Sequence, residues 1–76
     1  MTRKLPVATG KQVARLAERL GFEFRRQRGS HAIYVRARDR TRVVIPIHGS
    51  AELKPKTLRG IIEDLKLTVE EFRSLL

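Results

Sequence analysis

The sequence has no cysteine, no tryptophan, few aromatic residues and fewer acidic than basic side chains. The absence of cysteine excludes a disulfide framework and a thiolate metal site, and it favours a reducing compartment. No apolar run approaches the length of a membrane-spanning helix, and the first ten residues lack the apolar stretch of a secretory signal. A helix lying on a membrane surface would need a large apolar face carrying Trp or Phe, and tryptophan is missing. We therefore predict a cytoplasmic protein that does not associate with membranes.

What the chain does contain is an excess of basic residues. It has 76 residues with 17 Lys+Arg and 8 Asp+Glu, for a net charge of +9. The first 60 residues hold 15 basic and 4 acidic side chains, so the excess belongs to them. A guanidinium group can pair with two phosphate oxygens at once, so clustered arginines favour a polyanion as partner, although a solvated surface would also carry charge. The clustered arginines are Arg25, Arg26, Arg28, Arg36, Arg38, Arg40 and Arg42.

The first predicted element is a helix of about three turns. Thr9 and Gln12 have the spacing of a capping box at its start. Apolar residues at positions 13, 16, 17 and 20 recur with helical spacing, and Gly21 stands where a left-handed residue ends a helix. Lys11 falls on the polar side of this helix.

Three strands are predicted next, because the hydrophobic period changes to two at Phe22 and Phe24. Gly29 and Ser30 interrupt this pattern as a turn, and Pro46 indicates an edge position or a strand end. We expect Tyr34 and all three phenylalanines to lie in the core, with base stacking as an alternative for Tyr34. The predicted strands span residues 22–28, 31–36 and 41–47.

Two helices are predicted after the strands. Pro55 fits the first turn of one helix, and Gly60 inside it costs about 1 kcal/mol relative to Ala. Thr68 and Glu71 form a second capping-box pattern, which begins a short C-terminal helix. At this length one core must suffice, so we predict a single domain over residues 1–76. Its class is α+β, a two-layer fold with the helices on one face of a three-stranded antiparallel sheet.

Two histidines can exchange a proton near neutral pH. His31 begins the second predicted strand, and His48 follows the third. Since consecutive strands of an antiparallel meander run in opposite directions, the two positions are expected at the same end of the sheet. The sequence does not decide which face of residues 31–36 is the core, because both faces carry apolar side chains.

A histidine among arginines suits the cleavage of RNA by attack of a ribose 2′-OH on the adjacent phosphorus. That reaction needs a base for the 2′-OH proton and cations for the charge that develops on phosphorus. It needs no metal or other cofactor, and two histidines without cysteine make a poor metal-ligand set. The residues alone leave a surface or structural role for His31 open.

Several segments together resemble the HicA toxin family of bacterial and archaeal toxin–antitoxin systems. The most specific is Gly29-Ser30-His31 after a Gly-Phe strand, joined to a Pro-x-His near the end of the third strand. Lys56 and Lys66 depart from the family pattern, where small residues, typically Gly, are common. The matching segments are KLPVATGKQVARLAERLGF (4–22), GFEFRRQRGSHAIYVR (21–36), VVIPIHG (43–49) and ELKPKTLRGIIEDLKLTVEEF (52–72).

The resemblance implies a fold like the double-stranded-RNA-binding domain, α-β-β-β-α, and metal-independent cleavage of messenger RNA. It places the catalytic histidine at His31, and it implies a HicB antitoxin as protein partner. His48 matches a second recurrent histidine. The expected RNA contacts are Lys11, Arg25, Arg26, Arg28, Gly29, Ser30, Arg36 and His48.

Two alternatives to a nuclease stay open at this point. The charge distribution equally suits a non-catalytic RNA-binding module that recognises phosphates and 2′-OH groups. A degenerate toxin that retains only antitoxin binding would have the same sequence features.

Overall fold

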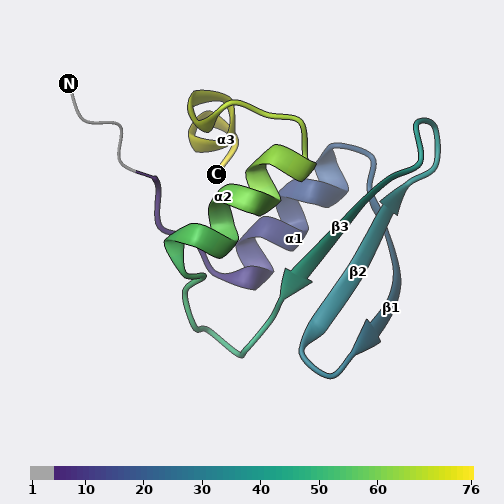
Figure 1. Cartoon of the computed structure of the whole chain (residues 1–76), viewed down its shortest axis with the longest axis horizontal. Coiled ribbons are helices and arrows are strands. Elements are labelled where there is room, and N and C mark those ends of the chain that lie inside the picture. Colours follow the sequence, from purple (N-terminus) through teal and green to yellow (C-terminus); the bar gives the residue numbers. More distant parts are fainter. Residues whose placement is uncertain (1–4) are drawn as a thin grey trace.

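The chain folds into one antiparallel sheet and three helices. The computed structural model describes residues 5–76, so Arg3 and Lys4 of the basic excess lie outside the described residues. The strands lie in the order β1-β2-β3, and Figure 1 shows the helices on one side of them. The predicted α+β architecture with the order α-β-β-β-α is confirmed. The elements are α1 (Gly10–Arg19), β1 (Glu23–Arg28), β2 (His31–Arg36), β3 (Thr41–Pro46), α2 (Pro55–Asp64) and α3 (Val69–Leu75).

Local capping fixes both ends of α1. The Thr9 N–H donates to Gln12 Oε1 at 2.8 Å, and the Gln12 N–H donates to Thr9 Oγ1 at 3.2 Å, which confirms the predicted capping box. At the other end Gly21 has φ +93°, and the N–H groups of Gly21 and Phe22 bond back to the last turn. This pattern is a Schellman motif, and it turns the chain out of α1 toward β1.

The end of α2 repeats this motif without glycine. The Lys66 N–H donates to Glu63 O at 2.9 Å, and the Leu67 N–H donates to Ile62 O at 3.2 Å. Lys66 has φ +62°, a left-handed conformation that favours glycine. The departure from the family pattern at this position therefore has a conformational cost. Two residues later, Thr68 and Glu71 form the predicted capping box of α3.

The core lies between the helices and one face of the sheet. Ala32 and Tyr34 of β2 belong to it, together with Val43 and Ile45 of β3. This decides the question that the sequence left open, because the face with Ala32 and Tyr34 packs against the helices. The helical core residues are Val13, Ala14, Leu16 and Ala17 of α1, Leu58, Ile61 and Ile62 of α2, and Phe72 of α3.

One predicted core residue is not in the core. Phe22 and Phe72 are buried as expected, but Phe24 keeps 51% of its surface exposed. The prediction was wrong because β1 is an edge strand whose six residues are all exposed. Period-two alternation marked Phe24 as facing inward but did not show that the helices leave this edge uncovered.

The first helical residue approaches the sheet closely. A Cβ atom on Gly10 would lie 2.1 Å from the carbonyl oxygen of Pro46, and such a contact does not occur in folded proteins. Gly10 is buried, and no local sequence pattern marks this contact. The absence of a side chain lets α1 begin directly against the end of β3.

Candidate functional site

A tight turn positions His31. Arg28 of β1 pairs with His31 of β2, so Gly29 and Ser30 form a two-residue hairpin turn. Gly29 has φ +58°, as a primed turn requires at its first position. The backbone N–H of Ile47 donates to Ser30 O at 2.7 Å and ties the turn to the chain after β3. The backbone around His31 is thus held by β1 on one side and by the segment after β3 on the other. The side chain of His31 is exposed.

His31 lies on the sheet face opposite the helices. Cross-strand partners share a face, and we call the face with His31, Ile33 and Val35 the open face. On it Arg28 and Pro46 flank His31 from β1 and β3. The next row is Arg26, Ile33 and Val44, and the third row is Glu23, Val35 and Arg42.

The open face combines apolar residues with arginines. Ile33 is only 6% exposed, although the helices pack on the other side of the sheet. Arg26 and Arg28 are exposed on β1, and Arg42 is exposed on β3. Arg42 belongs to the clustered arginines for which the sequence predicts a polyanionic partner, but its place on the open face was not predicted. The signal was present, because Arg42 has the strand parity of Pro46, but the identity of the open face was needed to use it.

A bulge in β1 decides which side chains reach the open face. The register shifts between Phe24 and Arg26, so Phe24 pairs with Tyr34 while Arg26 pairs with Ile33. In a regular strand Phe24 and Arg26 would share a face. The bulge at Arg25 instead directs Phe24 to the helix side and leaves Arg26 on the open face.

His48 lies at the same end of the sheet as His31, as expected from the topology. It follows β3 by two residues and is exposed. Together with Pro46, Lys54 and Thr57 it lines a cavity of about 310 Å³. Since Pro46 is the cross-strand partner of His31, this cavity adjoins the His31 end of the sheet.

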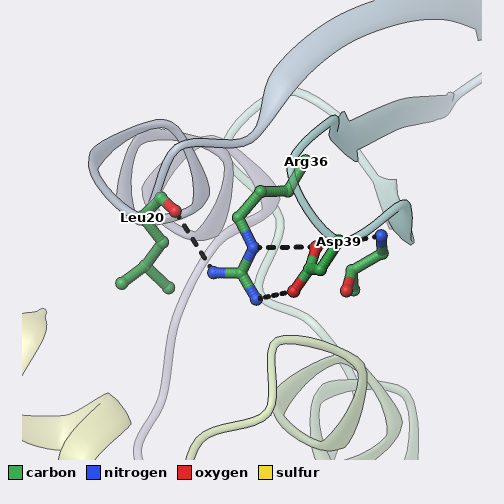
Figure 2. Close-up of polar contacts among 4 residues, drawn as sticks. Leu20, Arg36 and Asp39 are labelled. Carbon is green, nitrogen blue, oxygen red and sulfur yellow. Dashed lines mark hydrogen bonds and ion pairs between the residues drawn. The ribbon is translucent and has the colours of Figure 1, made fainter.

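Arg36 is separated from the other arginines by its own contacts. Its Nε and Nη2 atoms bond to Asp39 Oδ1 and Oδ2 at 3.2 and 2.9 Å, and its Nη1 donates to Leu20 O at 3.2 Å. Figure 2 shows the guanidinium between these two partners. The guanidinium carbon also lies 4.6 Å from the centre of the Phe22 ring, and the residue is only 8% exposed. The expectation that Arg36 contacts RNA therefore gives way to a structural role.

The remaining basic residues do not form one surface. Arg38 and Arg40 lie in the turn between β2 and β3, at the opposite end of the sheet from His31. Lys11 is exposed on α1, which packs on the other face. The arginine cluster of the sequence is thus divided between the open face, the far turn and the buried Arg36. Residues 5–76 contain no group of three or more side chains that could hold a metal ion.

No helix within the described part of the chain has the length and apolar character needed to cross a membrane.

A family model described as HicA toxin of bacterial toxin-antitoxin matches residues 10–67, about three quarters of the chain. This span begins with α1, includes the whole sheet and ends just after α2. No curated protein matches the chain.

Proposed function

The chain belongs to the HicA toxin family of bacterial toxin–antitoxin systems, and from this premise we propose that it is a metal-independent endoribonuclease that cleaves messenger RNA. It would be the toxin of a type II system. The observation that carries the proposal is the placement of His31. This histidine is exposed at the start of the central strand, on the face that also presents Arg26, Arg28 and Arg42.

In the proposed reaction His31 acts as an acid–base group on a ribose 2′-OH. The imidazole removes the 2′-OH proton, the 2′-oxygen attacks the adjacent phosphorus, and the bond from phosphorus to the 5′-oxygen breaks. The 5′-oxygen takes a proton from water as it leaves, and the imidazolium then releases its proton to the solvent. The products are a 2′,3′-cyclic phosphate and a 5′-hydroxyl. Arg28 is the cross-strand neighbour of His31, and its guanidinium would stabilise the charge that develops on the phosphorus.

The turn before His31 would let RNA approach the imidazole. Nothing lies within 4 Å of the position that a Cβ on Gly29 would occupy, so the space beside the turn is open. We assign Gly29 and Ser30 to this approach, and Arg26 with Arg28 to the phosphates near the cut. Arg25 and Lys11 would contact the RNA further from the cut, and His48 would contact it at the His31 end of the sheet.

A HicB antitoxin is the protein partner that we propose. The open face carries apolar side chains between arginines, and such a surface suits a partner with acidic residues around an apolar centre. Binding there would cover His31 and keep RNA away from it. The toxin would then be active only when the antitoxin is lost.

The reaction is tested with two RNAs of the same sequence, one natural and one with 2′-O-methyl groups throughout, in excess chelator. The natural RNA should be cut to fragments with cyclic phosphate ends, and the methylated RNA should stay intact. Cleavage of the methylated RNA, or a requirement for added metal, would contradict the proposal. Binding with steep salt dependence but no cleavage would instead favour the non-catalytic RNA-binding module.

A further inference from the structure

Phe24 is an aromatic side chain in an unusual position for its type. Three large apolar residues are exposed within residues 5–76, namely Val7, Phe24 and Leu76, and Phe24 is the aromatic one. It lies on β1, the edge strand of the sheet, beside the bulge at Arg25. Phe24 is not part of the core, whose phenylalanines are Phe22 and Phe72.

The ring of Phe24 is held in place from one side. Tyr34 is its cross-strand partner, and the two ring centroids are 5.6 Å apart with an angle of 71° between the planes. Tyr34 is itself 6% exposed and belongs to the core. Phe24 therefore rests on a fixed aromatic neighbour, while half of its surface is open to solvent.

Arginines lie on both elements next to this aromatic pair, the helix α1 and the strand β1. Tyr34 belongs to the same core as Leu16 and Ala17 of α1. Burial raises the pKa of its hydroxyl, and the Glu18 carboxylate raises it further. On α1, Glu18 lines a surface hollow together with Arg15 and Arg19. On β1, Phe24 is followed directly by the exposed Arg25 at the bulge.

We propose that Phe24 is a stacking platform for one unpaired base of the RNA substrate, with Arg15 and Arg25 contacting the neighbouring phosphates. This inference rests on the proposed function and specifies its substrate class, which is single-stranded RNA or an unpaired loop. A base offers a flat π face to an aromatic ring, and its backbone offers charge to the arginines. Bases inside a duplex are already stacked and cannot occupy the platform.

The surroundings of Phe24 favour RNA over a protein partner. A protein hot spot lies within a closely packed apolar patch from which water is excluded. Phe24 instead stands between Glu23 and Arg25, and its exposed strand neighbours are charged. A single exposed ring beside an arginine matches a stacking site for single-stranded nucleic acid.

The platform lies apart from His31, so it would bind a base away from the cut. Tyr34, the partner of Phe24, is three residues along β2 from His31, or roughly 10 Å at the rise of a strand. Phe24 faces the helix side and His31 the open face, and β1 is the edge between them. The RNA would therefore pass around the β1 edge from one face to the other.

The test measures RNA affinity in a His31→Ala background, where the RNA is not expected to be cut. Phe24→Leu keeps an apolar side chain without the π face, and Phe24→Tyr keeps the ring. Phe24→Leu should weaken binding of a labelled single-stranded RNA by about 5- to 100-fold and leave duplex binding unchanged. Phe24→Tyr should bind within about 3-fold of the parent. Val7→Ala, which removes another exposed apolar side chain, should have no effect.

A second readout does not depend on any variant. A 2-aminopurine base moved along the RNA should be quenched at one position on binding to the protein with Phe24, because stacking quenches it. Equal RNA affinity for Phe24→Leu and its parent would overturn the inference, and so would the absence of a quenched position. A Phe24→Leu protein that loses antitoxin binding but keeps its RNA affinity would also overturn it. The proposed function is tested separately, by RNA cleavage with proteins that keep His31. Cleavage without base stacking would therefore refute the platform and leave the nuclease in place.

Discussion

The Arg36 side chain connects three parts of the molecule. It bonds to the Leu20 carbonyl at the end of α1, lies over the Phe22 ring and forms two bonds to Asp39 in the turn after β2. The Thr41 N–H adds a bond to Asp39 Oδ1 at 3.1 Å. The hydrogen bond from Arg36 is the main cause that holds the pKa of the Asp39 carboxyl well below its usual range, and the bond from the Thr41 N–H lowers the pKa further.

The Asp39 carboxylate makes the stability of the fold depend on pH. Because the pKa of Asp39 is lower in the folded than in the unfolded state, where it is about 3.9, the pair stabilises the fold fully above that pH. The stabilisation is lost as the pH falls further. Urea unfolding at pH 7 and pH 3 should show a smaller acid loss for Asp39→Asn than for the wild type. A Glu63→Gln control should keep the wild-type acid loss, and an equal acid loss in Asp39→Asn would contradict the role of the pair.

At the scale of elements, two glycines in helices have opposite structural meanings. Gly10 begins α1 where a Cβ would meet the Pro46 carbonyl oxygen, and Gly60 lies inside α2 where a Cβ would meet nothing within 4 Å. The first is required by the contact between α1 and β3. The second provides no close contact and only lowers the helix propensity of α2.

Alanine substitutions at these glycines should therefore change stability in opposite directions. Gly60→Ala should raise the free energy of unfolding by about 1 kcal/mol, because alanine is the better helix former. Gly10→Ala should lower it by about 1–3 kcal/mol, because α1 or β3 must shift to relieve the overlap. Chemical denaturation of the two variants measures both values. A Gly10→Ala protein as stable as the wild type would show that α1 does not need this close approach.

The elements could be predicted from the sequence where their signals are local. The capping boxes at Thr9 and Thr68 set the starts of α1 and α3, since each depends on residues three positions apart. The bulge at Arg25 has no such signal, because it depends on how β1 pairs with β2. Without the bulge, the face that carries Arg26 could not be derived. The exposure of Phe24 depends on the position of β1 at an uncovered edge of the sheet.

The candidate site could be predicted from the sequence only in part, because some of its features depend on contacts between residues that are distant in the sequence. The pairing of strands implied that His31 and His48 share one end of the sheet, and the structure agrees. The open face of β2 could not be chosen, because Ile33 and Tyr34 are both apolar and lie on opposite faces. The burial of Arg36 depends on Leu20 and Phe22, which are distant in the sequence and meet it only in the folded chain.

At the scale of the whole molecule, the fold separates the basic residues into groups at different distances from His31. Arg26 and Arg28 share its face, whereas Arg38 and Arg40 lie in the turn at the other end of the sheet. Net charge alone does not distinguish these groups. Phosphate contacts depend on position, so the two groups should contribute differently to RNA binding near the cut.

Matched double variants test this separation. Arg26→Gln with Arg28→Gln should weaken RNA binding across all sequences. The negative slope of log K against log salt should become shallower by about 1.4, since each phosphate contact on a single strand contributes about 0.7. Arg38→Gln with Arg40→Gln removes the same charge and should change the slope less. Salt titrations of RNA affinity in the His31→Ala background provide the comparison. Equal slopes for the two variants would mean that RNA binding follows net charge and not the open face.

The proposed RNA cleavage depends most on His31. Its most direct test is the single-turnover rate of RNA cleavage by the wild type and by His31→Ala in excess chelator. Loss of a general acid–base group should slow cleavage by at least about 100-fold. RNA affinity and the free energy of unfolding should stay close to the wild-type values, because His31 is exposed on the open face. A His31→Ala protein that cuts RNA at the wild-type rate would contradict the central claim.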